Sequence, residues 1–154
     1  MEISLKNKVA LVTGGNEGIG HATALALAHA GASVVIASRN EKKGLETIQM
    51  IEKSGGCGKA LFVKTDITKE EEISSLIQKI IDIYGALHIA FNNAGVDGFG
   101  DLDQTSVEEY DRMFNTNVKG LFFSMKYELR AMLKSGEGAI VNTSSIQGHI
   151  CVPL

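Results

Sequence analysis

The sequence predicts an α/β fold, because two features of the chain favour a parallel sheet covered by helices. Short apolar runs alternate with segments of helical character along all 154 residues. The first apolar run leads through a glycine-rich loop into an alanine-rich segment, the usual join between a strand and a helix in such folds. Both features indicate a Rossmann-like, doubly wound sheet in three α/β/α layers. Right-handed crossovers between about five strands would give the strand order 3-2-1-4-5.

Five apolar runs have the length of strands. Each is almost continuously apolar, which is typical of parallel strands that are buried on both faces. In chain order they are Val9–Val12, Ser33–Ala37, Ala60–Val63, Leu87–Phe91 and Ala139–Val141. With 44% hydrophobic and 21% charged residues the chain can bury a core, and we expect residues 1–154 to form a single domain.

Helices are expected between these strands. The first is the alanine-rich stretch from His21 to Ala30. Another is an apolar stripe of helical spacing from Ile73 to Tyr84, which Gly85 ends and which a capping box of Thr68 and Glu71 would begin. A longer helix should start near Thr105 or Ser106, each with a Glu three residues on, and run to about Leu133.

Composition excludes several classes of partner. The net charge of −3 and the absence of basic runs give no field that would attract nucleic acid or an anionic membrane. Cys57, Cys151 and the four histidines match no metal-ligand spacing, so no metal site is expected. No apolar stretch approaches the length of a signal core or a membrane span, and we therefore expect a cytoplasmic protein.

The glycine-rich loop predicts a phosphate site. Residues 13–20 read TGGNEGIG and lie between the first expected strand and the first expected helix. Glycine allows a positive φ and close approach of the backbone to a ligand, and the free N–H groups of the following helix attract anionic oxygen. The alternative is an ordinary tight turn, although three spaced glycines weaken a fold unless close approach is needed. The context of strand, loop, helix and second strand favours dinucleotide binding.

Four further segments follow the glycine loop at successive points of the strand and helix alternation. They are Thr65-Asp66-Ile67, Asn92-Asn93-Ala94-Gly95, Asn115–Gly120 and Ile140–Ser145. With the loop spacing T-G-x-x-x-G-x-G, this set resembles the classical short-chain dehydrogenase/reductase family over essentially the whole chain. The resemblance implies a domain that binds NAD(P) and an enzyme that transfers a hydride between the nicotinamide cofactor and an alcohol/carbonyl substrate.

The resemblance also assigns cofactor-binding residues. The glycines would shape the pyrophosphate site, Ile19 would lie against the cofactor, Thr13 would tie the loop by a hydrogen bond, and Asp66 would accept a hydrogen bond from the adenine amino group. Without the family, Asp66 is a turn or capping residue ahead of Thr68, and the turn at 92–95 is simply polar. The full set is Thr13, Gly14, Asn16, Gly18, Ile19, Gly20, Ser38, Arg39, Asp66, Ile67, Asn93, Ala94 and Gly95.

The end of the second strand should select the cofactor. An acidic residue there would hold the ribose hydroxyls of NAD, but this chain has Ser38 followed by Arg39. A guanidinium beside a hydroxyl suits a 2′-phosphate, which favours NADP(H), with NAD(H) as the alternative. Glu17 points the other way, because some relatives that bind NADP carry a basic residue in that part of the loop. The other interpretation of Arg39 is a solvated charge next to Glu41.

Two of the family's four catalytic residues have counterparts in this sequence. Ser145 matches the serine that hydrogen-bonds the reacting oxygen, and Asn117 matches the asparagine that orders a water in the proton relay. Their plainer interpretations are a serine at a strand end and an asparagine that satisfies a helix kink. The residues four positions after the three tyrosines, at 84, 110 and 127, are His88, Phe114 and Ala131, so the Tyr-x-x-x-Lys pair is absent.

By the family spacing, that tyrosine would fall just beyond Leu154. The alternative function is therefore a non-catalytic nucleotide-binding or subunit-associating module. The resemblance further implies that full-length relatives are homo-oligomers, which associate largely through the helix that contains Asn117 and the helix that follows it.

Overall fold

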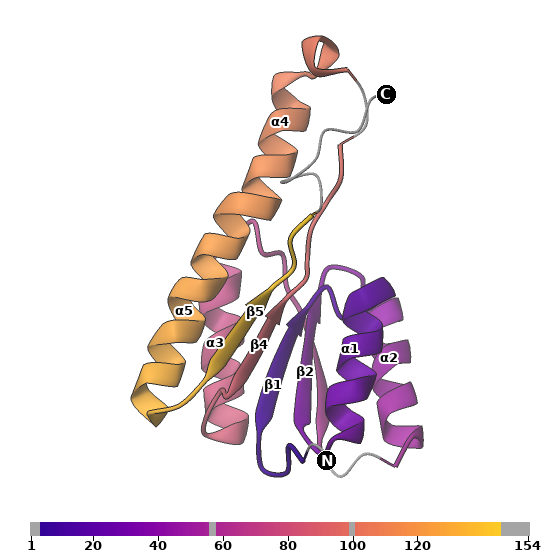
Figure 1. The fold of residues 1–154 in the computed structure, drawn as a ribbon, viewed down its shortest axis with the longest axis vertical. Coiled ribbons are helices and arrows are strands. Elements are labelled where there is room, and N and C mark those ends of the chain that lie inside the picture. The colour runs from indigo at the N-terminus through magenta and orange to yellow at the C-terminus, as the bar shows by residue number, and fades with distance from the viewer. Residues whose placement is uncertain (1–3, 56–57, 99–100, 146–154) are drawn as a thin grey trace.

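The computed structural model describes residues 4–55, 58–98 and 101–145. Its sheet has five parallel strands in the order β3-β2-β1-β4-β5, as the sequence predicts (Figure 1). The strands are β1 Val9–Thr13, β2 Ser33–Ser38, β3 Ala60–Lys64, β4 Ile89–Asn92 and β5 Ala139–Asn142. Because all five are parallel, their carboxyl ends meet at one edge of the sheet, where the connecting loops can form a site.

Helices cover both faces of the sheet. The α-helices are α1 Gly18–His29, α2 Glu41–Lys53, α3 Glu70–Tyr84, α4 Val107–Phe114 and α5 Leu121–Ser135. A 3-10 turn, Leu102–Gln104, precedes α4, and a π-helical segment, Asn115–Gly120, joins α4 to α5. In Figure 1, α1 and α2 lie on one side of the sheet, and α3 and α5 lie on the other, which gives the expected three layers.

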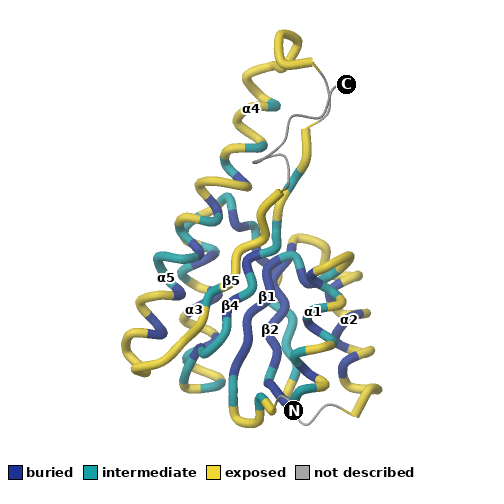
Figure 2. Tube along the Cα trace, in the orientation of Figure 1, coloured by how far each residue is buried: buried dark blue, intermediate teal, exposed yellow. Residues whose placement is uncertain are grey.

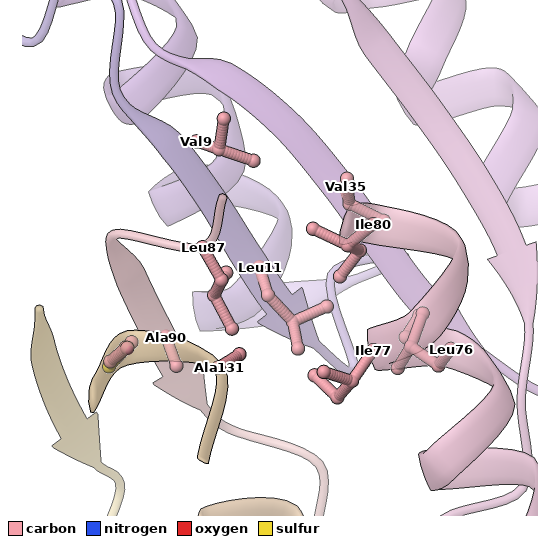
Figure 3. Close-up of a cluster of buried hydrophobic side chains, with 11 residues drawn as sticks. Val9, Leu11, Val35, Leu76, Ile77, Ile80, Leu87, Ala90 and Ala131 are labelled. Atoms are coloured by element: carbon pink, nitrogen blue, oxygen red, sulfur yellow. The ribbon is translucent and has the colours of Figure 1, made fainter. Parts of the chain in front are cut away.

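Alternating residues of the central strands form two apolar cores. Val9, Leu11 and Val35 pack with side chains of α3 and α5 (Figure 3), and Ala10 and Val12 pack with side chains of α1 and α2. Figure 2 shows β1 and β2 buried along their length and β5 largely exposed at the edge of the sheet. Within the described residues β5 pairs with β4 alone, and Val141 is 55% exposed.

The structure corrects the expected start of the fourth strand. β4 begins at Ile89 and not at Leu87, because pairing with β1 starts at the pair Ala10 and Ile89. Leu87 is fully buried nevertheless, so its apolar side chain packs in the core although its backbone lies outside the sheet.

The expected capping box of Thr68 and Glu71 is wrong. Helix α3 begins at Glu70, and Lys69 in the capping position makes no side-chain capping bond. Thr68 instead donates to the Asp66 carboxylate from its backbone N–H and from its hydroxyl, at 3.0 and 2.8 Å. The Glu72 carboxylate accepts a hydrogen bond from the backbone N–H of Asp66 at 2.8 Å and holds the loop onto the helix. A side-chain turn at Asp66 therefore replaces the capping box.

The expected long helix is one helical run with an irregular centre. Ser106 caps α4 by accepting a hydrogen bond from the backbone N–H of Glu109, which selects Ser106 over Thr105 as the start. The run ends at Ser135, where Gly136 takes a left-handed conformation with φ of 82°. The π-helical segment was not predicted. It brings Gly120 so close to the loop after β3 that a Cβ there would lie 2.9 Å from the Ile67 carbonyl oxygen.

Large apolar side chains lie exposed along α4, the π-helical segment and α5. Most are spaced by three or four residues, so they follow one side of the helical run. They are between 46% and 78% exposed: Val107, Tyr110, Phe114, Val118, Phe122, Leu129 and Leu133. We refer to these seven residues as the apolar row.

Candidate functional site

The loops at the carboxyl ends of the strands enclose a cleft of about 590 Å³. Its lining comes from the loop after β1, the end of β2, the loop after β3, the turn after β4, and Thr116 of the π-helical segment. Eleven of the thirteen predicted cofactor-binding residues line it: Gly14, Asn16, Gly18, Ile19, Ser38, Arg39, Asp66, Ile67, Asn93, Ala94 and Gly95. Thr13 and Gly20 are not among the lining residues. The site that the sequence predicts in scattered segments is thus brought together in one place.

The glycine loop is shaped for close approach. Gly14 and Gly18 have φ of 65° and 55°, a conformation that residues with side chains rarely adopt. At Gly20 a Cβ would lie 2.3 Å from the Gly14 carbonyl oxygen and 2.6 Å from the Asn93 side-chain nitrogen. Glu17 precedes α1 without a side-chain capping bond, and the first turn holds no acidic residue. The N–H groups at this helix end are therefore available to an anion in the cleft.

Thr13 fastens the turn after β4 to the end of β1. Its hydroxyl oxygen accepts hydrogen bonds from the backbone N–H groups of Asn93 and Ala94, at 3.1 and 3.2 Å. The Asn93 side-chain amide donates in turn to the Gly14 carbonyl, at 3.4 Å. The expected tie from Thr13 thus runs to the neighbouring turn, and Asn93 makes the tie to the glycine loop.

Asp66 has the local bonds of a turn residue and also faces the cleft. Its Oδ1 accepts both hydrogen bonds from Thr68. Partial burial raises the pKa of the Asp66 carboxyl, but the bonds from Thr68 and the charges of Arg39 and Lys69 outweigh burial, and the net pKa is lowered. The group is therefore an ionised acceptor at neutral pH.

The rim of the cleft near the end of β2 carries both signs of charge. Arg39 is exposed, and the buried Ser38 donates from its hydroxyl to the Asn40 carbonyl at 3.4 Å. Glu17 forms an ion pair with Lys43 of α2, and this hydrogen bond is the main cause of its lowered pKa. Sequence reasoning missed Lys43, because no local pattern links it to a residue 26 positions earlier.

A second cleft of about 400 Å³ adjoins the first and shares Asn93, Ala94 and Gly95 with it. Asn117, Leu121 and residues 143–145 also line it, so the structure brings both predicted catalytic residues, Ser145 and Asn117, to one cavity. The Asn117 amide accepts a hydrogen bond from the backbone N–H of Val96 at 2.9 Å and donates to its carbonyl at 2.8 Å. The Asn117 side chain thus holds the loop after β4.

None of the three tyrosines, all of which are described, is among the lining residues of this second cleft. Burial raises the pKa of Tyr84, and the Tyr127 hydroxyl donates to Glu70 at 2.9 Å. Tyr110 stacks on Phe114, with ring centroids 4.1 Å apart. Within the described part of the chain, no phenol therefore lines this cleft.

No group of three or more His, Cys, Asp or Glu side chains among the described residues could hold a metal ion. Cys57, Cys151 and His149 lie outside the described residues. None of the described helices has the length and apolar character that crossing a membrane requires.

Comparisons with known proteins show the family to which this chain is similar. Residues 8–154 match the family model described as short chain dehydrogenase. A cyclohexanol dehydrogenase from Acinetobacter sp. (strain SE19) is 40% identical over 151 residues, which cover 97% of this chain and 59% of that protein. An uncharacterized oxidoreductase from Thermotoga maritima is 39% identical over 151 residues, or 98% of this chain and 59% of that protein.

A solved structure gives the same result. The crystal structure of a short-chain type dehydrogenase/reductase from Mycobacterium marinum is similar with a TM-score of 0.93 and 34% identity. The match covers 99% of this chain and 62% of that one. The chain thus spans about three fifths of the length of the relatives that it matches.

Proposed function

Because this chain belongs to the short-chain dehydrogenase family, we propose that the protein is an oxidoreductase that transfers a hydride between NADP(H) and an alcohol or carbonyl substrate. The observation that carries the proposal is the first cleft, where eleven predicted cofactor-binding residues meet at the carboxyl edge of the sheet. In open α/β sheets this edge is where ligands bind.

The residues of the first cleft fit a dinucleotide. A pyrophosphate would lie at the uncapped start of α1, where Gly14 and Gly20 leave no room for a side chain but allow the backbone to approach. Ile19 is 65% exposed beside this position and would cover the ligand. Arg39 at the rim would pair with a 2′-phosphate, which supports NADP(H) over NAD(H). Asp66, as an ionised acceptor, would receive the adenine amino group.

The second cleft would hold the reacting groups. The nicotinamide, when bound, supplies or accepts the hydride. Ser145 would hydrogen-bond the substrate oxygen, and Asn117 would keep the loop at Val96 in place as one wall of the cavity. Transfer of a proton to or from that oxygen needs an acid or base with a pKa near neutrality, a role that no tyrosine of these 154 residues fills.

A second candidate function is a module that binds the nucleotide or associates with a subunit without catalysis, and the exposed apolar row supports it. The apolar row gives such a module a surface for a second copy of the chain, which is also the association that the family resemblance implies.

Turnover distinguishes the two candidates. The protein is mixed with NADP⁺ and secondary alcohols, beginning with cyclohexanol, the alcohol in the name of one relative. Reduction of the cofactor supports the oxidoreductase, and saturable NADPH binding without turnover supports the module. A folded chain that neither binds NADPH nor turns over contradicts the oxidoreductase and the nucleotide-binding module. The cytoplasmic location remains a prediction that fractionation of the native source can check.

A further inference from the structure

Glu128 is an ionisable residue buried inside the fold. It lies on the inner face of α5, and its side chain is 0% exposed. Its Oε2 accepts a hydrogen bond of 2.9 Å from the side-chain nitrogen of Asn92, the last residue of β4. Its Oε1 and the Asn92 Oδ1 are both buried, and neither has a hydrogen-bond partner among the described residues. Two bonded side chains thus each keep one unpaired acceptor oxygen.

One proton resolves this arrangement. An ionised Glu128 would be a buried charge with a single hydrogen bond, which is costly, and it would leave both oxygens unpaired. A proton on Oε1 removes the charge and supplies the donor that Asn92 Oδ1 lacks. A carboxylic acid and a primary amide can then face each other through two antiparallel hydrogen bonds. We propose that Glu128 is protonated in the folded protein, that it forms this acid–amide pair with Asn92, and that the pair positions the carboxyl ends of β4 and β5.

The acid–amide pair can position the second cleft because Asn92 joins the two strands. The other hydrogen of its side-chain nitrogen is donated to Asn142 Oδ1 at 3.1 Å, and the backbone carbonyl of Asn92 accepts from the backbone N–H of Thr143 at 2.9 Å. The Thr143 hydroxyl also donates to Asn93 Oδ1 at 3.4 Å. The Asn92 side-chain nitrogen donates both to Glu128 and to Asn142, so the bond with Glu128 holds the Asn92 amide where it also bonds to β5.

Residues 93–95 and 143–145 follow immediately and line the second cleft. The acid–amide pair therefore holds together the two segments that carry the proposed cofactor and substrate contacts. Glu128 is a positioning residue and not a catalytic one, because it does not line the cleft itself. The effect of Glu128 on catalysis rests on the proposed function. Its protonation and its role in holding the strand ends do not.

The surroundings of Glu128 allow its proton to be lost near neutral pH. Burial raises the pKa of the carboxyl to about 7, against a lowering by the bond from Asn92. Strands β4 and β5 contain no titratable side chain. On the packed helices, Glu70 of α3 pairs with Lys126 at 2.7 Å and is also near Arg130, and Lys119 of the π-helical segment is exposed. None of these charges forms a bond with Glu128, so burial controls its titration.

The test is a titration of the 154-residue chain followed by carbon NMR of labelled glutamate carboxyl groups. We expect one glutamate to titrate with a midpoint near 7, and its signal to be absent from Glu128→Gln. Glutamine is the matched variant, because its amide can form the same two hydrogen bonds with Asn92 but cannot ionise. In the wild type, the backbone amide signals of Asn93 and Thr143 should shift with the same midpoint, and in Glu128→Gln they should stay constant.

A Glu128 that titrates at the ordinary value of 4.5 would overturn the proposal. So would amide signals of Asn93 and Thr143 that ignore the titration, since the carboxyl would then position nothing. The glutamate titration and the amide shifts are both measured in the wild type, so they test the proposal even if the variant does not fold.

NADPH titrations separate this inference from the proposed function. As pH rises through neutrality, we expect the affinity of the wild type for NADPH to fall severalfold relative to that of Glu128→Gln. The variant is the reference because titration of the cofactor's own phosphate affects both proteins equally. Equal pH dependence in both proteins would contradict the role in the site. No NADPH binding at any pH, with Glu128 still titrating near 7, would overturn the proposed function and leave the acid–amide pair standing.

Discussion

Replacing Gly20 by alanine tests whether the glycine loop is built for close approach. In a helix, alanine is favoured over glycine by about 1 kcal/mol, so helix propensity alone predicts a more stable protein. The structure predicts the opposite, because the added Cβ would lie 2.3 Å from the Gly14 carbonyl oxygen and 2.6 Å from the Asn93 side-chain nitrogen. Both neighbours line the first cleft, and the bond between them joins the glycine loop to the turn after β4.

The expected magnitude follows from these contacts. Forcing a methyl group into a closed space costs about 1–3 kcal/mol, which cancels or exceeds the gain in helix propensity. We expect Gly20→Ala to lower the free energy of unfolding by up to about 2 kcal/mol in urea titrations followed by circular dichroism. Displacement of the Gly14 carbonyl should weaken NADPH binding at least tenfold, or about 1.4 kcal/mol.

Gly136→Ala is the matched control. Gly136 has φ of 82° at the end of α5, and a Cβ there meets nothing within 4 Å. Alanine at that position costs about 1–2 kcal/mol of backbone strain without touching the cleft, so NADPH affinity should be unchanged. A Gly20→Ala protein that is more stable than wild type and binds NADPH equally well would refute the reasoning.

Three further predictions concern other parts of the site. Arg39→Asp should lower NADPH affinity at least tenfold, or about 1.4 kcal/mol, and raise NADH affinity, as measured by fluorescence titration; unchanged selectivity would show that Arg39 does not read the 2′-phosphate. Thr13→Val leaves the N–H groups of Asn93 and Ala94 without their acceptor and should cost roughly 2–4 kcal/mol of unfolding free energy, whereas Thr13→Ser, which keeps the hydroxyl, should cost far less. Equal losses in the two variants would mean that the hydroxyl is not the tie. The raised pKa of Glu128 means that the folded state keeps a proton that the unfolded chain releases above pH 4.5. Stability from this group is therefore complete below pH 4.5 and falls by roughly 3 kcal/mol as pH rises through about 7, a slope that Glu128→Gln should remove from urea titrations.

The sheet could be predicted because its signal is repeated. Five apolar runs separated by helical segments allow few topologies once crossovers are right-handed, and the observed strand order agrees. The boundaries were less accurate where burial and strand pairing diverge. Leu87 is apolar and fully buried, like Ala90 of β4, but its backbone precedes the first pair with β1.

Local competition explains the errors in the helices. Thr68 has the spacing of a capping residue, but Asp66 lies two positions before it and takes both of its donors. The π-helical segment was not predicted from periodicity. It packs at Gly120 against the Ile67 backbone, a tertiary contact that the local sequence does not show.

The meeting of the proposed site residues in one cleft could be predicted, but the bonds among them could not. Gly14, Arg39 and Asp66 reach the first cleft because each follows a parallel strand. The partners of these residues, such as Lys43 with Glu17, depend on how helices pack and have no sequence pattern. The burial of Glu128 did have a sequence pattern, because Glu128 lies four residues from Ser124 and from Met132, on the same buried face of α5.

Calorimetric titration of the 154-residue chain with NADPH tests the central claim most directly, namely that the first cleft binds a dinucleotide. We predict saturable binding with one site per chain, which is weakened in Gly20→Ala and unchanged in Gly136→Ala. Absence of binding by a chain that circular dichroism shows to be folded would contradict the account, and so would binding that is the same in both variants.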